Sequence, residues 1–326
     1  MNASTKKKGL CLCSIMFPKR VDRLVATTKL KKFIVTFAYY LVLCSLAFVF
    51  VYPFLKMLVT SVMSDSDLVN ITVTWLPSEI VWENYKVAFK QLGYKSYFIN
   101  SLQITLIGTL GHLLSCSLAG YGFARYKFKL NGVLFAVVVL SMLVPVQTLI
   151  FPLYIQYSKM GLIKVLKGYV PILLPCFFGY GLNGAFFIFL FRQFFSGLPK
   201  EMEEAARIDG CGALMTFFRI MLPMSKASIL VSTVLSVVWH WNDYFEPNIY
   251  ITNGGDQVLP SRLPALYKLL NMEETMDLVE EMGGFLFNNG MLMAGTFLVV
   301  LPILIIYAFL QKQFMEGVER SGLTGM

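Results

Sequence analysis

The stretch LPKEMEEAARIDGCGALMTFFRIMLP, residues 198–223, lies between two long apolar segments and decides how the sequence is interpreted. Pro199 suits the first position of a short helix, because the N–H group that it lacks would have no partner there. Three glutamates follow in the opening turns, where carboxylates complement the helix dipole. Gly210 predicts a left-handed helix end, and Pro223 predicts an interruption of a second short helix. The stretch therefore predicts two short helices separated by a glycine break.

The composition of the whole chain is that of an integral membrane protein. Of its 326 residues, 56% are hydrophobic and only 14% are charged. Soluble domains have about 45–50% apolar and about 25% charged residues, and a soluble core cannot bury such an excess. A soluble enzyme, a disordered chain and a disulfide-rich secreted module are therefore excluded.

Six segments are apolar over about 20 residues, the length that a helix needs to cross a bilayer. They are residues 33–59, 101–124, 133–157, 168–191, 224–250 and 285–311. Five prolines in these segments predict kinks or interruptions: Pro145, Pro152, Pro171, Pro175 and Pro302. The expected fold class is all-α integral membrane, with six transmembrane helices.

Charge sets the expected orientation and domain boundaries. Cytoplasmic segments of membrane proteins carry an excess of lysine and arginine. If both termini are inside the cell, most of the 28 lysines and arginines fall in inner segments, although a short outer connection at 158–167 holds three lysines. We expect a basic inner tail at 1–32, a six-span domain at 33–312 and an inner tail at 313–326. The six-span domain contains the inner loop 196–226 and the outer loops 60–100 and 253–284. Cys11 and Cys13 lie in the first tail, and reduced thiols are the preferred interpretation.

The sequence holds no recognisable catalytic or metal signature. It contains no Gly-Lys dipeptide, so it lacks the phosphate-binding loop of an ATPase. It also lacks His-Glu-x-x-His and Gly-x-Ser-x-Gly, and its only histidines are His112 and His240. We therefore expect no metal site and no catalytic residues. His112 lies inside an apolar span, where a neutral histidine hydrogen-bonded between helices is preferred over a functional group.

The inner loop resembles the EAA loop of ABC importer permeases, through Glu204-Ala205-Ala206, Asp209-Gly210 and the run from Ile220 to Pro223. Weaker stretches resemble the carbohydrate branch of that superfamily, in particular the second permease subunit of maltose-type transporters. They are YFINS (97–101), AGYGFAR (119–125), IFPLY (150–154), RQFF (192–195), WND (241–243), MAG (293–295) and LP (301–302). The resemblance runs from about residue 75 to the end.

This resemblance implies the type I ABC importer fold and a role as half of a transmembrane pathway for a sugar or oligosaccharide. The implied partners are a homologous second permease, two cytoplasmic ATPase subunits that bind ATP and Mg²⁺, and an extracellular solute-binding lipoprotein, at a bacterial plasma membrane. No cofactor of its own and no nucleic acid are implied. The residues expected to couple to an ATPase are Glu204, Ala205, Ala206, Asp209, Gly210, Ile220, Leu222 and Pro223.

A candidate substrate contact lies near the end of the fifth apolar segment, at Trp239, Trp241, Asn242 and Asp243. Aromatic rings there could stack on a sugar, and the polar groups could bind its hydroxyls. An interfacial aromatic belt that ends a helix explains the same residues equally well.

Two other functions stay open on the sequence alone. A permease of this kind could carry a solute other than a sugar. A self-contained secondary transporter or channel is a weaker alternative, because three of the six apolar segments contain no acidic, basic or histidine residue that would couple transport to an ion. A membrane-embedded enzyme is weaker still, since no catalytic set is visible.

Overall fold

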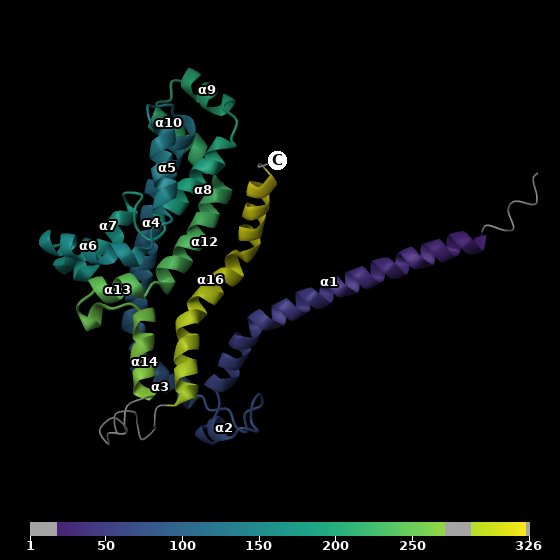
Figure 1. Ribbon diagram of the computed structural model, residues 1–326. Coiled ribbons are helices and arrows are strands. Elements are labelled where there is room, and N and C mark those ends of the chain that lie inside the picture. Colours follow the sequence, from purple (N-terminus) through teal and green to yellow (C-terminus); the bar gives the residue numbers. More distant parts are fainter. Residues whose placement is uncertain (1–17, 271–287, 324–326) are drawn as a thin grey trace, which may run out of the picture. The chain divides into compact units, whose positions relative to one another are not determined.

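The computed structural model describes the backbone of residues 18–270 and 288–323, and the side chains of residues 31–270 and 288–312. Across these ranges the chain is helical and contains no strand (Figure 1). The chain divides into two compact units, Met1–Val59 and Thr60–Met326, and each is described by itself.

The first unit is built on helix α1 (Pro18–Ser61), whose segment Lys31–Ser61 is long and apolar enough to cross a membrane. The expected first span, 33–59, lies inside it. The helix begins within the segment expected to be a tail, with Pro18 at its first position, where a proline is tolerated. Cys11 and Cys13 lie outside the described residues.

The second unit is organised around four helices that pack side by side. They are α4 (Tyr94–Arg125), α8 (Gly184–Ser196), α12 (Lys226–Asn242) and α16 (Asn289–Leu323). Helix α4 packs along both α8 and α12, and α12 packs along α16. Gly120 permits the close approach of α4 to α8, because a Cβ atom there would lie 2.6 Å from the Cβ of Phe191.

The third expected span is sharply bent. It forms α5 (Asn131–Ser141) and α6 (Val146–Lys159), which meet at 100°. Pro145 precedes α6 and adopts an extended conformation, so the predicted interruption at this proline is confirmed. Pro152 and Pro302, in contrast, lie inside α6 and α16.

The fourth and fifth expected spans are not single helices either. The fourth begins at the end of η1 (Leu162–Gly168) and continues as α7 (Val170–Cys176), and α8 follows after a loop in which Gly181 has a φ of +119°. The fifth consists of α12 and the short α13 (Phe245–Tyr250). Ser225 separates α12 from the preceding α11 (Leu222–Met224), with an 80° bend between the two arms.

By length and composition, three described helices could cross a membrane, or five if each bent pair counts as one span. The apolar helix α8 is shorter, with 13 residues. Of the sixth expected span, residues 285–287 lie outside the described ranges, and α16 begins at Asn289. The count of six spans stays a prediction.

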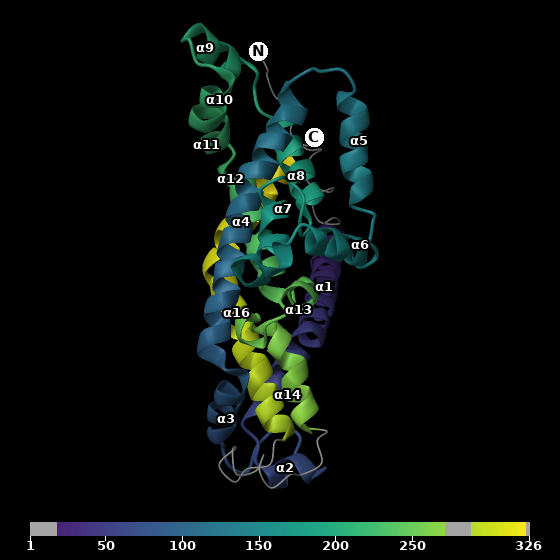
Figure 2. The same cartoon turned by 90° about the vertical axis from the view of Figure 1, so that its left-hand side faces the viewer.

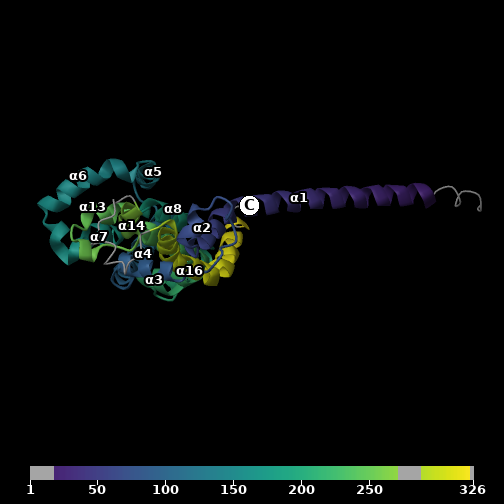
Figure 3. The same cartoon turned by 90° about the horizontal axis from the view of Figure 1, so that it is seen from below.

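Short helices occupy the two ends of the second unit (Figure 2). One end holds α2 (Asp65–Val69), α3 (Glu83–Leu92) and α14 (Leu263–Leu270). The other end holds α9 (Glu201–Ile208), α10 (Ala213–Thr216) and η2 (Phe217–Met221), a single π-helical turn. Between the ends, α6, α7 and α13 lie on the side of the bundle opposite α16 (Figure 3).

The two expected outer loops are folded where the structure describes them. In the first, the buried Asp67 carboxylate accepts hydrogen bonds of 2.8 Å from the hydroxyl and from the backbone N–H of Ser78. These bonds hold the pKa of Asp67 below its usual value. In the second, which forms η3 (Gly254–Asp256) and η4 (Pro260–Arg262), Lys167 pairs with Asp256 at 3.0 Å and lowers the pKa of that carboxyl.

Candidate functional site

Helix α9 presents one face to the rest of the unit and one face to its surroundings. Glu203 and Ala206, one turn apart, are buried at 7% and 2% exposure. Glu204, Ala205, Asp209 and Gly210 are exposed. The Glu-Ala-Ala motif is therefore split, with its first two residues available to a partner and its last one packed inward.

The end of α9 is a Schellman motif, and it confirms the left-handed stop predicted at Gly210. Gly210 has a φ of +81°. Its N–H donates to the carbonyl of Arg207 at 3.1 Å, and the N–H of Cys211 donates to the carbonyl of Ala206 at 2.9 Å. Both bonds satisfy carbonyls that a helix end would otherwise leave unpaired.

The start of α9 is held by Arg125, the last residue of α4. Its guanidinium donates to the carbonyls of Leu198 at 2.8 Å and Pro199 at 3.1 Å. Its Nε also lies 3.5 Å from the Oε1 of Glu203, in an ion pair without hydrogen-bond geometry whose side chains are only 5% and 10% exposed. The helix begins at Glu201, so Pro199 precedes it, and the expectation that this proline takes the first helical position is wrong.

The second half of the loop is anchored by aromatic packing. Phe217 is fully buried, with its ring 5.2 Å from that of Tyr121 on α4 and 6.2 Å from that of Phe195 on α8. Of the residues expected to support this half, Ile220 and Leu222 are half-buried and Pro223 is exposed. The loop is thus fixed to α4 at both of its ends.

The outer surface of the loop is unusually apolar for an exposed segment. Ile208 is 86% exposed, Leu214 62% and Phe218 51%, and Met202 and Met215 are also exposed. Exposed apolar side chains in a segment that also carries the charged side chains of α9 are typical of protein–protein contact surfaces.

A cavity of about 260 Å³ lies deeper in the unit, between α5, α6, α7, α8, α12 and α13. Its wall includes Trp239, Phe186 and the tyrosines at 157, 180 and 250, with Asn183 and Glu246 as polar groups. Aromatic faces combined with a few polar groups are what a small-molecule site requires.

The four expected substrate contacts do not lie together. Only Trp239 lines the cavity, where its ring packs 5.4 Å from Phe186. Trp241 is 2% exposed and donates to the carbonyl of Val299 at 3.0 Å, on α16. Asn242 is exposed, and the carboxylate of Asp243 accepts from the N–H groups of Phe245 and Glu246 at the start of α13.

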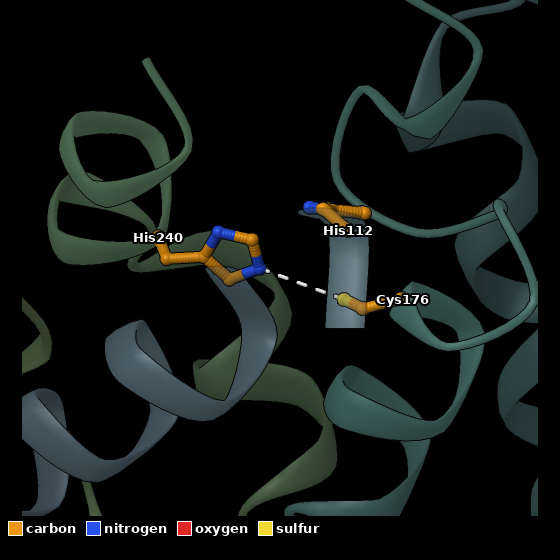
Figure 4. Close-up of side chains that lie close together, drawn as sticks. All are labelled: His112, Cys176 and His240. Atoms are coloured by element: carbon orange, nitrogen blue, oxygen red, sulfur yellow. Dashed lines mark hydrogen bonds between the residues drawn. The ribbon is translucent and has the colours of Figure 1, made fainter. Parts of the chain in front are cut away.

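The structure also brings together three residues that the sequence separates widely: His112 on α4, Cys176 at the end of α7 and His240 on α12 (Figure 4). All three are buried. The interpretation of His112 as an interhelical histidine fits its Nδ1, which lies 3.5 Å from the hydroxyl of Ser236 on α12.

Residues 111–319 match the family of binding-protein-dependent transport system inner membrane components. This match includes α9, the cavity wall and most of α16. The chain belongs to this family. It is a multi-pass membrane permease subunit of an ABC importer.

Curated relatives cover nearly the whole permease. It is 30% identical to the arabinooligosaccharides transport system permease protein AraQ of Halalkalibacterium halodurans, over 86% of this chain and 93% of that protein. It is 29% identical to the lactose transport system permease protein LacG of Rhizobium radiobacter, over 90% of this chain and 98% of that protein.

One solved structure supports the fold of the permease. It is the crystal structure of a bacterial ABC transporter involved in the import of the acidic polysaccharide alginate, with a TM-score of 0.71 and 20% sequence identity. The match covers 87% of this chain and 98% of that chain. The expected type I importer permease fold is confirmed.

Two features of the site were not predicted from the sequence. One is the role of Arg125, although an arginine as the last residue of a long apolar helix is a signal from which it could be predicted. The meeting of His112, Cys176 and His240 had no such signal, because the residues are more than 60 positions apart.

Proposed function

We propose that this chain forms half of the transmembrane pathway for uptake of a sugar or oligosaccharide, in a complex with a homologous second permease. Two cytoplasmic ATPase subunits bind ATP and Mg²⁺ and drive the cycle, and an extracellular solute-binding lipoprotein delivers the sugar. The chain performs no covalent chemistry and has no cofactor of its own. It lies in a bacterial plasma membrane with both termini in the cytoplasm.

The observation that carries the proposal is the form of the loop at residues 198–223. Its exposed residues Glu204, Ala205, Asp209 and Gly210 share the loop with exposed apolar side chains that an ATPase groove can bury. Its buried residues Glu203 and Phe217 join it to the end of α4. When an ATPase subunit binds the exposed residues and moves, the buried residues therefore transmit that movement to the membrane helices. Ile220 and Leu222 support this connection.

Sugar as the transported solute is supported by the relatives and by the cavity. The relatives are named for arabinooligosaccharides and lactose. The cavity offers the ring of Trp239 for stacking, with the amide of Asn183 and the carboxyl group of Glu246 for hydroxyl groups.

Replacement of Glu204 with lysine tests the coupling surface. Glu204→Lys is expected to reduce sugar uptake at least tenfold and to release the ATPase subunits during purification, because it reverses the charge of an exposed contact without disturbing the buried face. Glu79→Lys is the matched control, since Glu79 is exposed in the connection between α2 and α3, the short helices at the opposite end of the unit (Figure 2). Normal uptake and normal ATPase retention by Glu204→Lys would refute the coupling role.

Replacement of Trp239 tests the sugar pathway separately. The transported sugar is first identified by screening the solute-binding protein against a panel of neutral and acidic oligosaccharides. Trp239→Ala is then expected to lower uptake of that sugar about tenfold, which corresponds to the loss of about 1.4 kcal/mol of stacking. Trp82→Ala is the control, because Trp82 is 65% exposed and lies outside the cavity. Equal effects of the two variants would argue against sugar contact at Trp239.

A further inference from the structure

The cluster of His112, Cys176 and His240 has the composition and spacing of a metal site. One ligand atom from each residue lies within 4.8 Å of the other two. The Sγ of Cys176 and the Nε2 of His240 are 3.5 Å apart. A tetrahedral Zn²⁺ ion, with bonds of about 2.3 Å to sulfur and about 2.0 Å to nitrogen, separates such a pair by about 3.5 Å. Closing the site around an ion requires the ligand atoms of the remaining pairs to approach each other by up to about 1.5 Å.

The tautomer of His240 is suited to ligation. Its Nδ1 lies 2.9 Å from the carbonyl oxygen of Ser236, which can only accept, so Nδ1 carries the proton. The lone pair of the ring is then on Nε2, directed at the Cys176 sulfur (Figure 4). Metal-binding histidines are oriented in this way by a backbone carbonyl behind the ring.

His112 supplies the second, independent observation. It is 1% exposed, yet its Nε2 has no hydrogen-bond partner among the described residues. A Cβ atom placed on Gly181 would lie 3.0 Å from the Cys176 sulfur and 3.3 Å from this nitrogen, so both atoms face the same point. A buried polar atom without a partner is costly. If the three residues only formed hydrogen bonds with one another, the Nε2 of His112 would stay unpaired. A bound ion gives this nitrogen a partner.

The cluster is also within reach of the cavity. Gly181 and Gly184 line the cavity, and a Cβ atom on Gly184 would lie 3.7 Å from the His112 Nε2. Two glycines without side chains thus form the wall between the cavity and the three ligands. An ion can arrive from this side, and a water molecule from the cavity can complete its coordination.

We propose that His112, Cys176 and His240 form a Zn²⁺ site that joins α4, α7 and α12. Thiolate sulfur and neutral imidazole nitrogen are the ligand types that hold Zn²⁺ in proteins. On binding, the Cys176 thiol loses its proton to solvent and its sulfur forms a bond to the metal, with no change of oxidation state. The site goes beyond the proposed transport function and does not depend on it.

Cobalt substitution tests this site directly. The full-length chain, purified with the subunits that accompany it and treated with a chelator, is titrated with Co²⁺. One equivalent per chain is expected to produce a thiolate-to-cobalt charge-transfer band in the ultraviolet, which Zn²⁺ then abolishes. The isosteric Cys176→Ser is expected to lose the band, and Cys211→Ser, which removes a thiol outside the cluster, is expected to keep it.

A thermal measurement provides the second readout. Because the three ligands lie on three separate elements, Zn²⁺ is expected to raise the melting temperature of the wild-type chain and of Cys211→Ser, but not that of Cys176→Ser. The proposal is overturned if wild-type protein shows no cobalt–thiolate band, or if Cys176→Ser retains it. Failure of sugar uptake would leave both readouts intact, so the two proposals are tested separately.

Discussion

Gly210→Val is expected to abolish sugar uptake while the membrane-embedded helices stay folded. Gly210 has a φ of +81°, and among the described residues no atom beyond Gly210 and its two chain neighbours lies within 4 Å of where a Cβ would be placed. The cost is therefore one of backbone strain, about 1–3 kcal/mol for a β-branched residue in this conformation. Relief of that strain breaks the two hydrogen bonds that end α9, and the contact surface loses its form.

The neighbouring glycine is a control of the same chemistry. Gly212 has a φ of −68° and is equally open, so Gly212→Val introduces the same side chain without the strain. It should retain most of the uptake. Gly210→Asn should recover part of the function lost in Gly210→Val, because asparagine tolerates the left-handed region. Uptake, membrane abundance and ATPase retention are measured for all three. Equal defects in the two valine variants would show that the backbone conformation is not the cause.

Arg125→Ala is expected to be the most destabilising change in the loop region. Removal of one partner from a buried ion pair costs about 3–5 kcal/mol, because the other charge stays buried without compensation. Here the Glu203 carboxylate would be left in that state, and the carbonyls of Leu198 and Pro199 would lose their donor. We expect loss of ATPase binding and a lower melting temperature.

A double variant separates the ion pair from a general loss of packing. Glu203→Gln in the Arg125→Ala background removes the uncompensated charge, so it should restore part of the lost stability. Lys127→Ala, which removes one positive charge from an exposed position nearby, should have little effect. Arg125 would lose its assigned role if Arg125→Ala and Lys127→Ala behaved alike, or if the double variant were less stable than Arg125→Ala.

The loop at 198–223 shows what sequence can predict about this protein. The glycine stop at Gly210 and the break at Pro145 depend on local backbone chemistry, and the structure confirms both. The inward side of α9 could not be predicted in this way. Which of Glu203 and Glu204 is buried depends on Arg125, which is 78 positions from the first of them and reaches it only through the packing of α4 on α8.

The spans at 168–191 and 224–250 were predicted from apolar composition, which says how much of a segment is hydrophobic but not where its helix breaks. The loop before α8 needs positive φ values at Gly181 and Asn183, and Asp243 ends α12 by accepting the N–H groups of the next helix. Both breaks border the cavity. Composition therefore did not predict the helix breaks at the two places where the backbone leaves the helix to form the cavity.

The attachment of the loop to α4 at both ends, through Arg125 and Tyr121, has a mechanical consequence. Helix α4 contains 32 residues and is about 48 Å long. Its close contact with α8 at Gly120 lies one turn and a half from the driven end and can serve as a fulcrum. A small tilt imposed at Arg125 then produces a larger displacement in the longer part of α4, between Gly120 and Tyr94. This part carries His112 beside the cavity and ends at Tyr94, at the opposite end of the helix.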